Sequence, residues 1–252
     1  MGGMAMVHLA ALHPRLFHHM VLIEPMVILG LGHTTLVTLF SYATISKPDV
    51  WPSREAAEKF FRTSMPYKAW DPRVRDQMLR HGICERGGAG EVELVTSKHQ
   101  EAITFARPAN ADFSAWEFPT IEAAVALVPF LKPPVSYVFG ERSMLLPKEN
   151  RVPLMSTTGS GVGGSGGAAA GMVTEAEIKN GGHTIPLDAV DECAETVACA
   201  IANSLTKSAD IQKTLVQRSF KEGTSDVSEA WRAGVLKGVD IARKTRIRAI
   251  KL

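Results

Sequence analysis

Residues 1–25, MGGMAMVHLAALHPRLFHHMVLIEP, decide the fold class of this chain. Residues 4–12 are strong helix formers without Asp, Glu, Lys or Arg, which predicts a helix buried nearly all round. His13-Pro14 ends that helix, because the residue before a proline avoids the helical conformation. Residues 18–25 are a short apolar run that stops at a proline, which is typical of a buried strand in a parallel sheet. A buried helix followed by a buried strand indicates an α/β fold.

The rest of the chain extends this pattern. Residues 27–125 show helical periodicity broken by prolines, and Ser53 with Glu55 in the next turn marks one helix start. A run rich in β-branched and aromatic residues predicts a second strand at 135–141. Residues 174–183 are predicted as a third, more exposed strand with a turn, and residues 187–205 as an amphipathic helix. Three strands are few for a chain of this size, so we expect the C-terminal half of an α/β sheet with a helical cap insertion. Four parts are expected. Residues 1–26 form the elbow helix and a core strand, and residues 27–125 form the helical cap. Residues 126–206 form the C-terminal core with the histidine loop, and residues 207–252 form a basic helical tail.

Composition limits the classes of partner. The 252 residues are 45% hydrophobic and 21% charged, with a net charge of +2, so nucleic-acid binding is not expected. The three cysteines, Cys84, Cys193 and Cys199, have no metal-binding or redox spacing and fit a reducing compartment. No secretory signal is evident. The most apolar stretch, residues 18–40, is interrupted by a glutamate, a proline, two glycines and a histidine, and is a poor membrane span.

His183 is the first candidate for chemistry. It stands in NGGHTIP, after a predicted strand and two glycines. Histidine is the side chain best suited to proton transfer near neutral pH, and glycines beside it allow a tight turn and close approach of a substrate. A loop histidine without a role is the alternative.

The two glycines at the start add a second observation. Small residues between a strand and a helix are what a G-x-S-x-G nucleophile elbow requires. Gly2 and Gly3, the helix, the His-Pro pair and the strand together resemble the α/β-hydrolase superfamily over residues 2 to about 205. The resemblance implies a nucleophilic Ser directly before Met1, with the Met1 backbone N–H as one oxyanion donor. We therefore expect a truncated chain, with a catalytically inactive relative as the alternative.

The acid that orients His183 has two candidates. In the superfamily it usually follows the strand placed at 135–141 as G-x-x-D, where this chain has Gly140-Glu141-Arg142-Ser143. Some members instead carry the acid after the strand that follows the elbow helix, which here gives Glu24. A carboxylate at an apolar strand end is costly unless it is paired, which favours Glu24 and leaves Glu141 as the second candidate.

A glycine-rich stretch, TTGSGVGGSGGAAAG at 157–171, contains a G-x-G-x-x-G match at 161–166. No clear strand leads into it, so a flexible or nest-forming loop is favoured over a nucleotide site. Together with YVFGE and GGH-x-I-P, this stretch is similar to fungal α/β-hydrolases of the toxin-biosynthesis type, which resemble a yeast peroxisomal lipase.

The resemblance implies an ester or thioester hydrolase of fungal secondary metabolism, including toxin biosynthesis, that acts on a small acyl substrate. His183 is the expected general base, and neither a metal nor an organic cofactor is expected. The apolar cap would build the acyl pocket. A non-catalytic ligand-binding protein on a hydrolase scaffold is the alternative.

The C-terminus ends Ile250-Lys251-Leu252 after several basic residues. S-K-L is a peroxisomal address, and I-K-L keeps its last two residues. A peroxisomal import receptor is therefore an expected partner, and a cytoplasmic location with an ordinary basic tail is the alternative.

Overall fold

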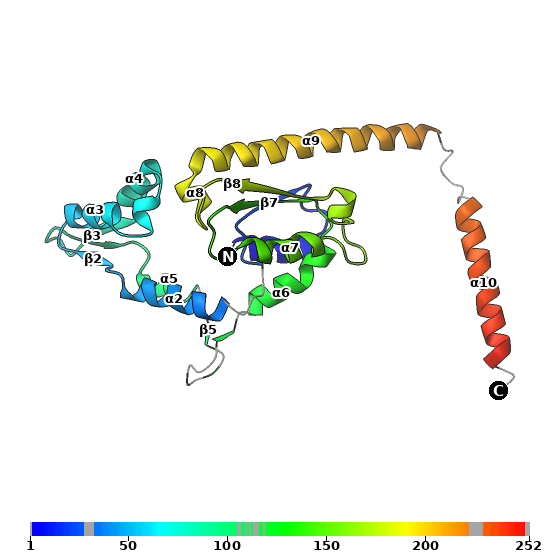
Figure 1. Cartoon of the computed structure of the whole chain (residues 1–252), viewed down its shortest axis with the longest axis horizontal. Helices are drawn as coiled ribbons and strands as arrows, with labels where there is room; N and C mark the ends of the chain where they lie inside the picture. Colours follow the sequence, from blue (N-terminus) through cyan, green and yellow to red (C-terminus); the bar gives the residue numbers. More distant parts are fainter. Residues whose placement is uncertain are drawn as a thin grey trace. The chain divides into compact units, whose positions relative to one another are not determined.

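The computed structural model describes residues 2–27, 33–104, 107–108, 110, 112, 116–117, 119–221 and 229–249. By its internal contacts the chain divides into two compact units, residues 1–202 and 203–252 (Figure 1). The first unit holds the central sheet and every candidate site residue described below.

The central sheet has three described strands, β1 (Met20–Ile23), β7 (Val135–Gly140) and β8 (Val173–Ile178), in the order β1-β7-β8. Both pairings are parallel, as predicted for the strands at 18–24, 135–140 and 174–179. β7 lies in the middle and is buried along its whole length, which agrees with its apolar and aromatic sequence.

Helices cover both faces of this sheet. On one face α1 (Gly2–Leu12), α6 (Pro119–Leu127) and α7 (Lys148–Thr157) enclose a core with Leu22, Tyr137 and Phe139. On the other face Val138 and Ile178 pack against α8 (Ile185–Asp188) and the start of α9 (Val190–Lys221). Two apolar faces explain why β1 and β7 are hydrophobic runs, whereas β8 is exposed at Thr174, Glu175 and Glu177.

The segment between β1 and β7 is not purely helical, and the prediction of a helical pattern over residues 27–125 was wrong where short strands lie between its helices. Strands β2 (Val50–Trp51), β3 (Ile83–Arg86) and β4 (Glu91–Leu94) form an antiparallel sheet in the order β2-β4-β3. Glycines with positive φ close the β3–β4 hairpin. The segment also contains α2 (His33–Ser46), α3 (Arg54–Thr63), η1 (Tyr67–Ala69), α4 (Pro72–His81), α5 (Lys98–Ala102), β5 (Arg107–Pro108) and β6 (Trp116–Glu117).

The C-terminal helices also differ from the prediction. The helix expected at 187–205 is two helices, because Ala189 has non-helical dihedrals and separates α8 from α9. α9 continues to Lys221, and α10 (Glu229–Ala249) follows in the second unit. Two short 3₁₀ turns, η2 (Val128–Phe130) and η3 (Ala168–Ala170), complete the first unit. Within the described ranges, no helix has the length and apolar character needed to cross a bilayer.

Candidate active site

Residues from the C-terminal ends of three adjacent parallel strands meet at one edge of the sheet. Glu24 directly follows β1, Gly140 is the last residue of β7, and His183 lies in the loop after β8. In open α/β sheets this edge is where ligands bind. The strand order β1-β7-β8 therefore brings together groups that are 159 residues apart in the sequence.

Glu24 leaves β1 in an unusual backbone conformation. Its φ is +45°, in the left-handed region that non-glycine residues rarely adopt, while its N–H still donates to the Val138 carbonyl at 2.9 Å. The residue is only 5% exposed. A buried carboxylate on a strained backbone is a pattern that clusters at functional sites.

Three groups contact the Glu24 carboxylate. Oε1 accepts from the Gly140 N–H at 2.6 Å, and Oε2 accepts from the Ser143 hydroxyl at 2.6 Å. His183 Nδ1 lies 2.9 Å from the same Oε2. Burying a carboxylate without partners is costly. Here hydrogen bonds to both oxygens offset that cost and fix the plane of the Glu24 carboxylate.

The His183 ring is held at one nitrogen. With Glu24 as acceptor, Nδ1 carries the proton, so Nε2 of the neutral ring can accept one. The side chain is 33% exposed, so a substrate can reach it. A carboxylate in this position can orient an imidazole and leave its second nitrogen free to accept a proton.

The loop before His183 depends on close packing. The left-handed residue of its turn is Asn180, with φ +60°. A Cβ on Gly140 would lie 2.3 Å from the Gly182 carbonyl oxygen and 2.5 Å from that of Gly181. The absence of a side chain at Gly140 therefore sets the distance between β7 and the histidine loop.

Of the two candidate acids, the structure brings only Glu24 to His183. The Glu141 carboxylate is exposed and accepts from the Asn180 backbone N–H at 2.7 Å, on the outer side of the turn. Glu141 is therefore not the acid that contacts His183. It follows the end of β7, and its carboxylate binds the backbone of the histidine loop instead of the ring. Ser143 was identified only as a departure from G-x-x-D, and its hydrogen bond to Glu24 was missed.

The other predicted positions are placed in part. Met1, the expected oxyanion donor, and the C-terminal residues Ile250, Lys251 and Leu252 lie outside the described residues. Gly3 packs against the strand end, because a Cβ there would lie 2.8 Å from Pro25 Cβ. The first turn of α1 is therefore next to the residue that follows Glu24.

Comparison with known proteins supports the same fold. Over 97% of this chain and 60% of the other, the structure superimposes on the peroxisomal alpha-beta-hydrolase Lpx1 of Saccharomyces cerevisiae with a TM-score of 0.59 and 17% identity. The likeness is one of fold: the chain has an α/β fold whose parallel sheet matches that of this solved hydrolase. No protein-family profile matches the sequence.

Fungal proteins of low sequence identity also resemble this chain. It is 27% identical to the type I acyl-CoA thioesterase mpaH' of Penicillium brevicompactum, over 97% of this chain and 66% of that protein. It is also 27% identical to the abhydrolase domain-containing protein AFT2-1 of Alternaria alternata, over 79% of each chain. The chain thus spans just under two thirds of the length of the Penicillium protein and of the yeast hydrolase.

The glycine-rich loop at 157–171 is closed by its own backbone. The N–H groups of Gly161 and Ser165 donate to carbonyls of residues 129 and 131 at 2.8 and 2.9 Å, and Gly166 N–H donates to the Gly159 carbonyl at 2.9 Å. A phosphate cradle needs such N–H groups unpaired and a following helix, whereas only the three-residue η3 follows here. Because these N–H groups are already paired, the loop does not have the geometry of a nucleotide site.

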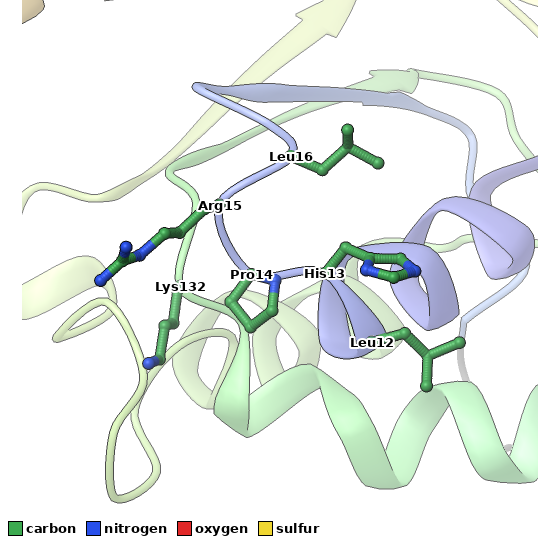
Figure 2. A pocket seen from close by; sticks show the side chains of 6 residues that line it. All are labelled: Leu12, His13, Pro14, Arg15, Leu16 and Lys132. Carbon is green, nitrogen blue, oxygen red and sulfur yellow. The ribbon is translucent and has the colours of Figure 1, made fainter.

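A surface pocket lies at the opposite edge of the sheet. It is lined by Leu12, His13, Pro14, Arg15, Leu16 and Lys132, and Figure 2 shows Arg15 and Lys132 extending to the same side. These residues precede β1 and β7, whereas Glu24 and Gly140 lie at the far ends of the same strands. In the ranges the structure describes, no group of three or more His, Cys, Asp or Glu side chains is placed to hold a metal ion.

Proposed function

We propose that this protein hydrolyses an acyl ester or acyl thioester by a serine-hydrolase mechanism. His183 is the general base, and Glu24 is the carboxylate that holds its ring and stabilises the imidazolium formed during the reaction. The observation that carries the proposal is the 2.9 Å contact between His183 Nδ1 and the buried, doubly hydrogen-bonded Glu24 carboxylate at the strand ends.

The nucleophile in this proposal is a serine directly before Met1, in a longer form of the chain. The Met1 N–H would then be one oxyanion donor, as in a nucleophile elbow. Support comes from the packing of Gly3 on Pro25, which brings the start of α1 beside Glu24, and from the greater length of the Penicillium and yeast proteins.

The substrate class follows from the relatives. The names of the Penicillium proteins specify acyl-CoA thioesters, so a small acyl thioester of fungal secondary metabolism, including toxin biosynthesis, is the proposed substrate. Residues 27–125 would form much of the acyl pocket. The similarity to a peroxisomal yeast hydrolase is consistent with recognition of Ile250-Lys251-Leu252 by a peroxisomal import receptor.

The test compares this chain with a form extended at the N-terminus by the in-frame upstream segment, or by that of a related hydrolase ending in Gly-His-Ser. The extended form should release p-nitrophenol from acyl esters and free thiol from acyl-CoA, whereas the chain beginning at Met1 should stay at background. His183→Ala or Glu24→Gln in the extended form should lower kcat by about 10²–10⁴-fold.

Glu141→Gln is the matched control, because it removes a carboxylate from the same strand ends without contacting His183. It should leave kcat nearly unchanged. Turnover that is insensitive to His183→Ala, or lost in Glu141→Gln but kept in Glu24→Gln, would overturn the proposed site. Binding of acyl-CoA without turnover by the extended form would instead support the ligand-binding alternative.

A further inference from the structure

Arg151 is a buried charge that the proposed mechanism does not use. It belongs to α7, is 2% exposed, and its guanidinium lies 4.8 Å from the centre of the Phe139 ring. Burying a guanidinium is costly, and an apolar residue of similar size would often be at least as stabilising. Its contacts therefore need an account beyond packing.

The guanidinium bridges two ends of one loop. Arg151 Nη2 donates to the Gly140 carbonyl and Nε donates to the Leu146 carbonyl, both at 2.6 Å. Nη1 donates to the Glu177 carboxylate of β8 at 2.7 Å. Only a planar fork with several donors can make these three contacts at once. Residues 140–146 are thus tied together at their base and to the neighbouring strand.

The same loop supplies both hydrogen bonds that orient the acid. Gly140 N–H and the Ser143 hydroxyl donate to the two oxygens of Glu24, and Leu146 N–H donates to Ser143 Oγ at 3.2 Å. The two residues whose carbonyls Arg151 holds therefore take part in the network that fixes the carboxylate. Release of the loop would leave Glu24 with His183 as its remaining partner in this network.

We propose that Arg151 is a positioning residue for the acid–base pair: by bridging the carbonyls of Gly140 and Leu146, it holds the loop whose donors orient Glu24 toward His183. The effect of Arg151 on catalysis rests on the proposed function. Its effect on the orientation of Glu24 and His183 can be measured in the chain without a nucleophile. A merely stabilising Arg151 would leave Glu24 and His183 unchanged in the molecules that remain folded.

The first measurement is the tautomer of His183 in the neutral ring, obtained by ¹⁵N NMR of the full chain and assigned by loss of the signal in His183→Gln. The parent chain should show the Nδ1–H form, because Nδ1 donates to Glu24. Arg151→Met should shift the ring toward the Nε2–H form that free histidine prefers. Arg151→Lys keeps a positive charge but lacks the fork, and should shift it in the same direction.

The matched control is Tyr137→Phe. This change removes a buried hydrogen bond of 2.8 Å between β7 and Thr158 but does not touch loop 140–146. It should leave the tautomer as in the parent chain. A folded Arg151→Met with the parent tautomer overturns the proposal. If Arg151→Met does not fold, the Lys variant decides, and an unchanged tautomer there overturns it.

The second measurement uses the extended, serine-containing form. Arg151→Met should lower kcat by about 10–100-fold with little change in KM, since misplacing a catalytic group by about 1 Å can cost 10²-fold. Failure of the parent form to hydrolyse esters would count against the proposed function and leave the NMR result standing. Parent turnover combined with an unchanged tautomer would reject the role of Arg151 alone.

Discussion

Ser143 donates its hydroxyl proton to Glu24, so removal of this hydroxyl tests how far the carboxylate depends on the loop after β7. Ser143→Ala should lower kcat of the extended form by about 10–100-fold, because a hydrogen bond to a charged group is worth about 1.5–3 kcal/mol. Steady-state kinetics would show this loss in kcat rather than KM. Ser156→Ala, at an exposed hydroxyl in α7, is the control and should have no effect.

Gly140 tests the spacing between β7 and the histidine loop. Gly140→Ala places a Cβ within 2.5 Å of two backbone carbonyl oxygens, which cannot move without displacing the loop of His183. We expect a loss of about 1–3 kcal/mol in the free energy of unfolding, measured by urea denaturation. Gly234→Ala in α10 has open space and should be neutral or stabilising. A stable Gly140→Ala chain would contradict the packing described here.

The sequence predicted a site residue best where the chemistry of a single side chain was enough to identify it. Glu24 was preferred as the acid because an apolar strand end disfavours an unpaired carboxylate, and the structure places it on His183. Arg151 could not be found in this way. Its partners are backbone carbonyls, which any residue provides, so no side-chain pattern in the sequence marks them.

At the scale of elements, β1 and β7 were predictable because each is a short apolar run. β8 was predicted as a more exposed strand followed by a turn, which agrees with its exposed Thr174 and Glu175. The β3–β4 hairpin was missed, although its glycine-rich turn was visible in the sequence. β3 is largely exposed and lacks the alternation that identifies a half-buried strand. β4 does alternate, with Val92 and Leu94 buried, but it has only four residues and lies in a segment that was predicted to be helical. The break at Ala189 likewise depends on packing of α8 and carries no glycine or proline at that position.

The ion pair between Arg151 of α7 and Glu177 of β8 should make a pH-dependent contribution to the free energy of unfolding. Burial opposes the charged form of Glu177, but the hydrogen bond from Arg151 and the nearby positive charges of Lys148 and Arg151 outweigh it, so its pKa is lowered. A lowered folded-state pKa contributes stability above the unfolded value of about 4.3, and this is lost as pH falls through the folded pKa.

Urea denaturation of the parent chain and Glu177→Gln would measure this effect. The difference in unfolding free energy should be constant above about pH 5 and shrink at lower pH. Glu175→Gln is the control, because Glu175 lies 3.9 Å from the Arg151 guanidinium and should show a smaller dependence. A difference that does not change with pH would mean that the Arg151–Glu177 pair contributes nothing to folding.

At the scale of the molecule, thiol reactivity reports whether the start of α9 stays packed against the central sheet. Cys84 and Cys199 are exposed, whereas Cys193, near the start of α9, is buried against Val138 and Ile178 of the sheet. Burial, together with the nearby Asp188 charge, raises the pKa of the Cys193 thiol. Ellman's reagent should therefore modify two thiols quickly in the native protein and the third only after denaturation. Three fast thiols would show that α9 does not cover this face of the sheet.

The left-handed backbone at Glu24 makes this position one where folding and catalysis select different amino acids. A non-glycine residue in this conformation costs about 1–2 kcal/mol, so glycine or asparagine suits the turn better. A library of all substitutions at position 24 should therefore enrich these two residues when selected for thermal resistance, and retain glutamate when selected for ester turnover. Sequence optimisation guided by stability alone would thus improve the scaffold of this protein while removing its proposed acid.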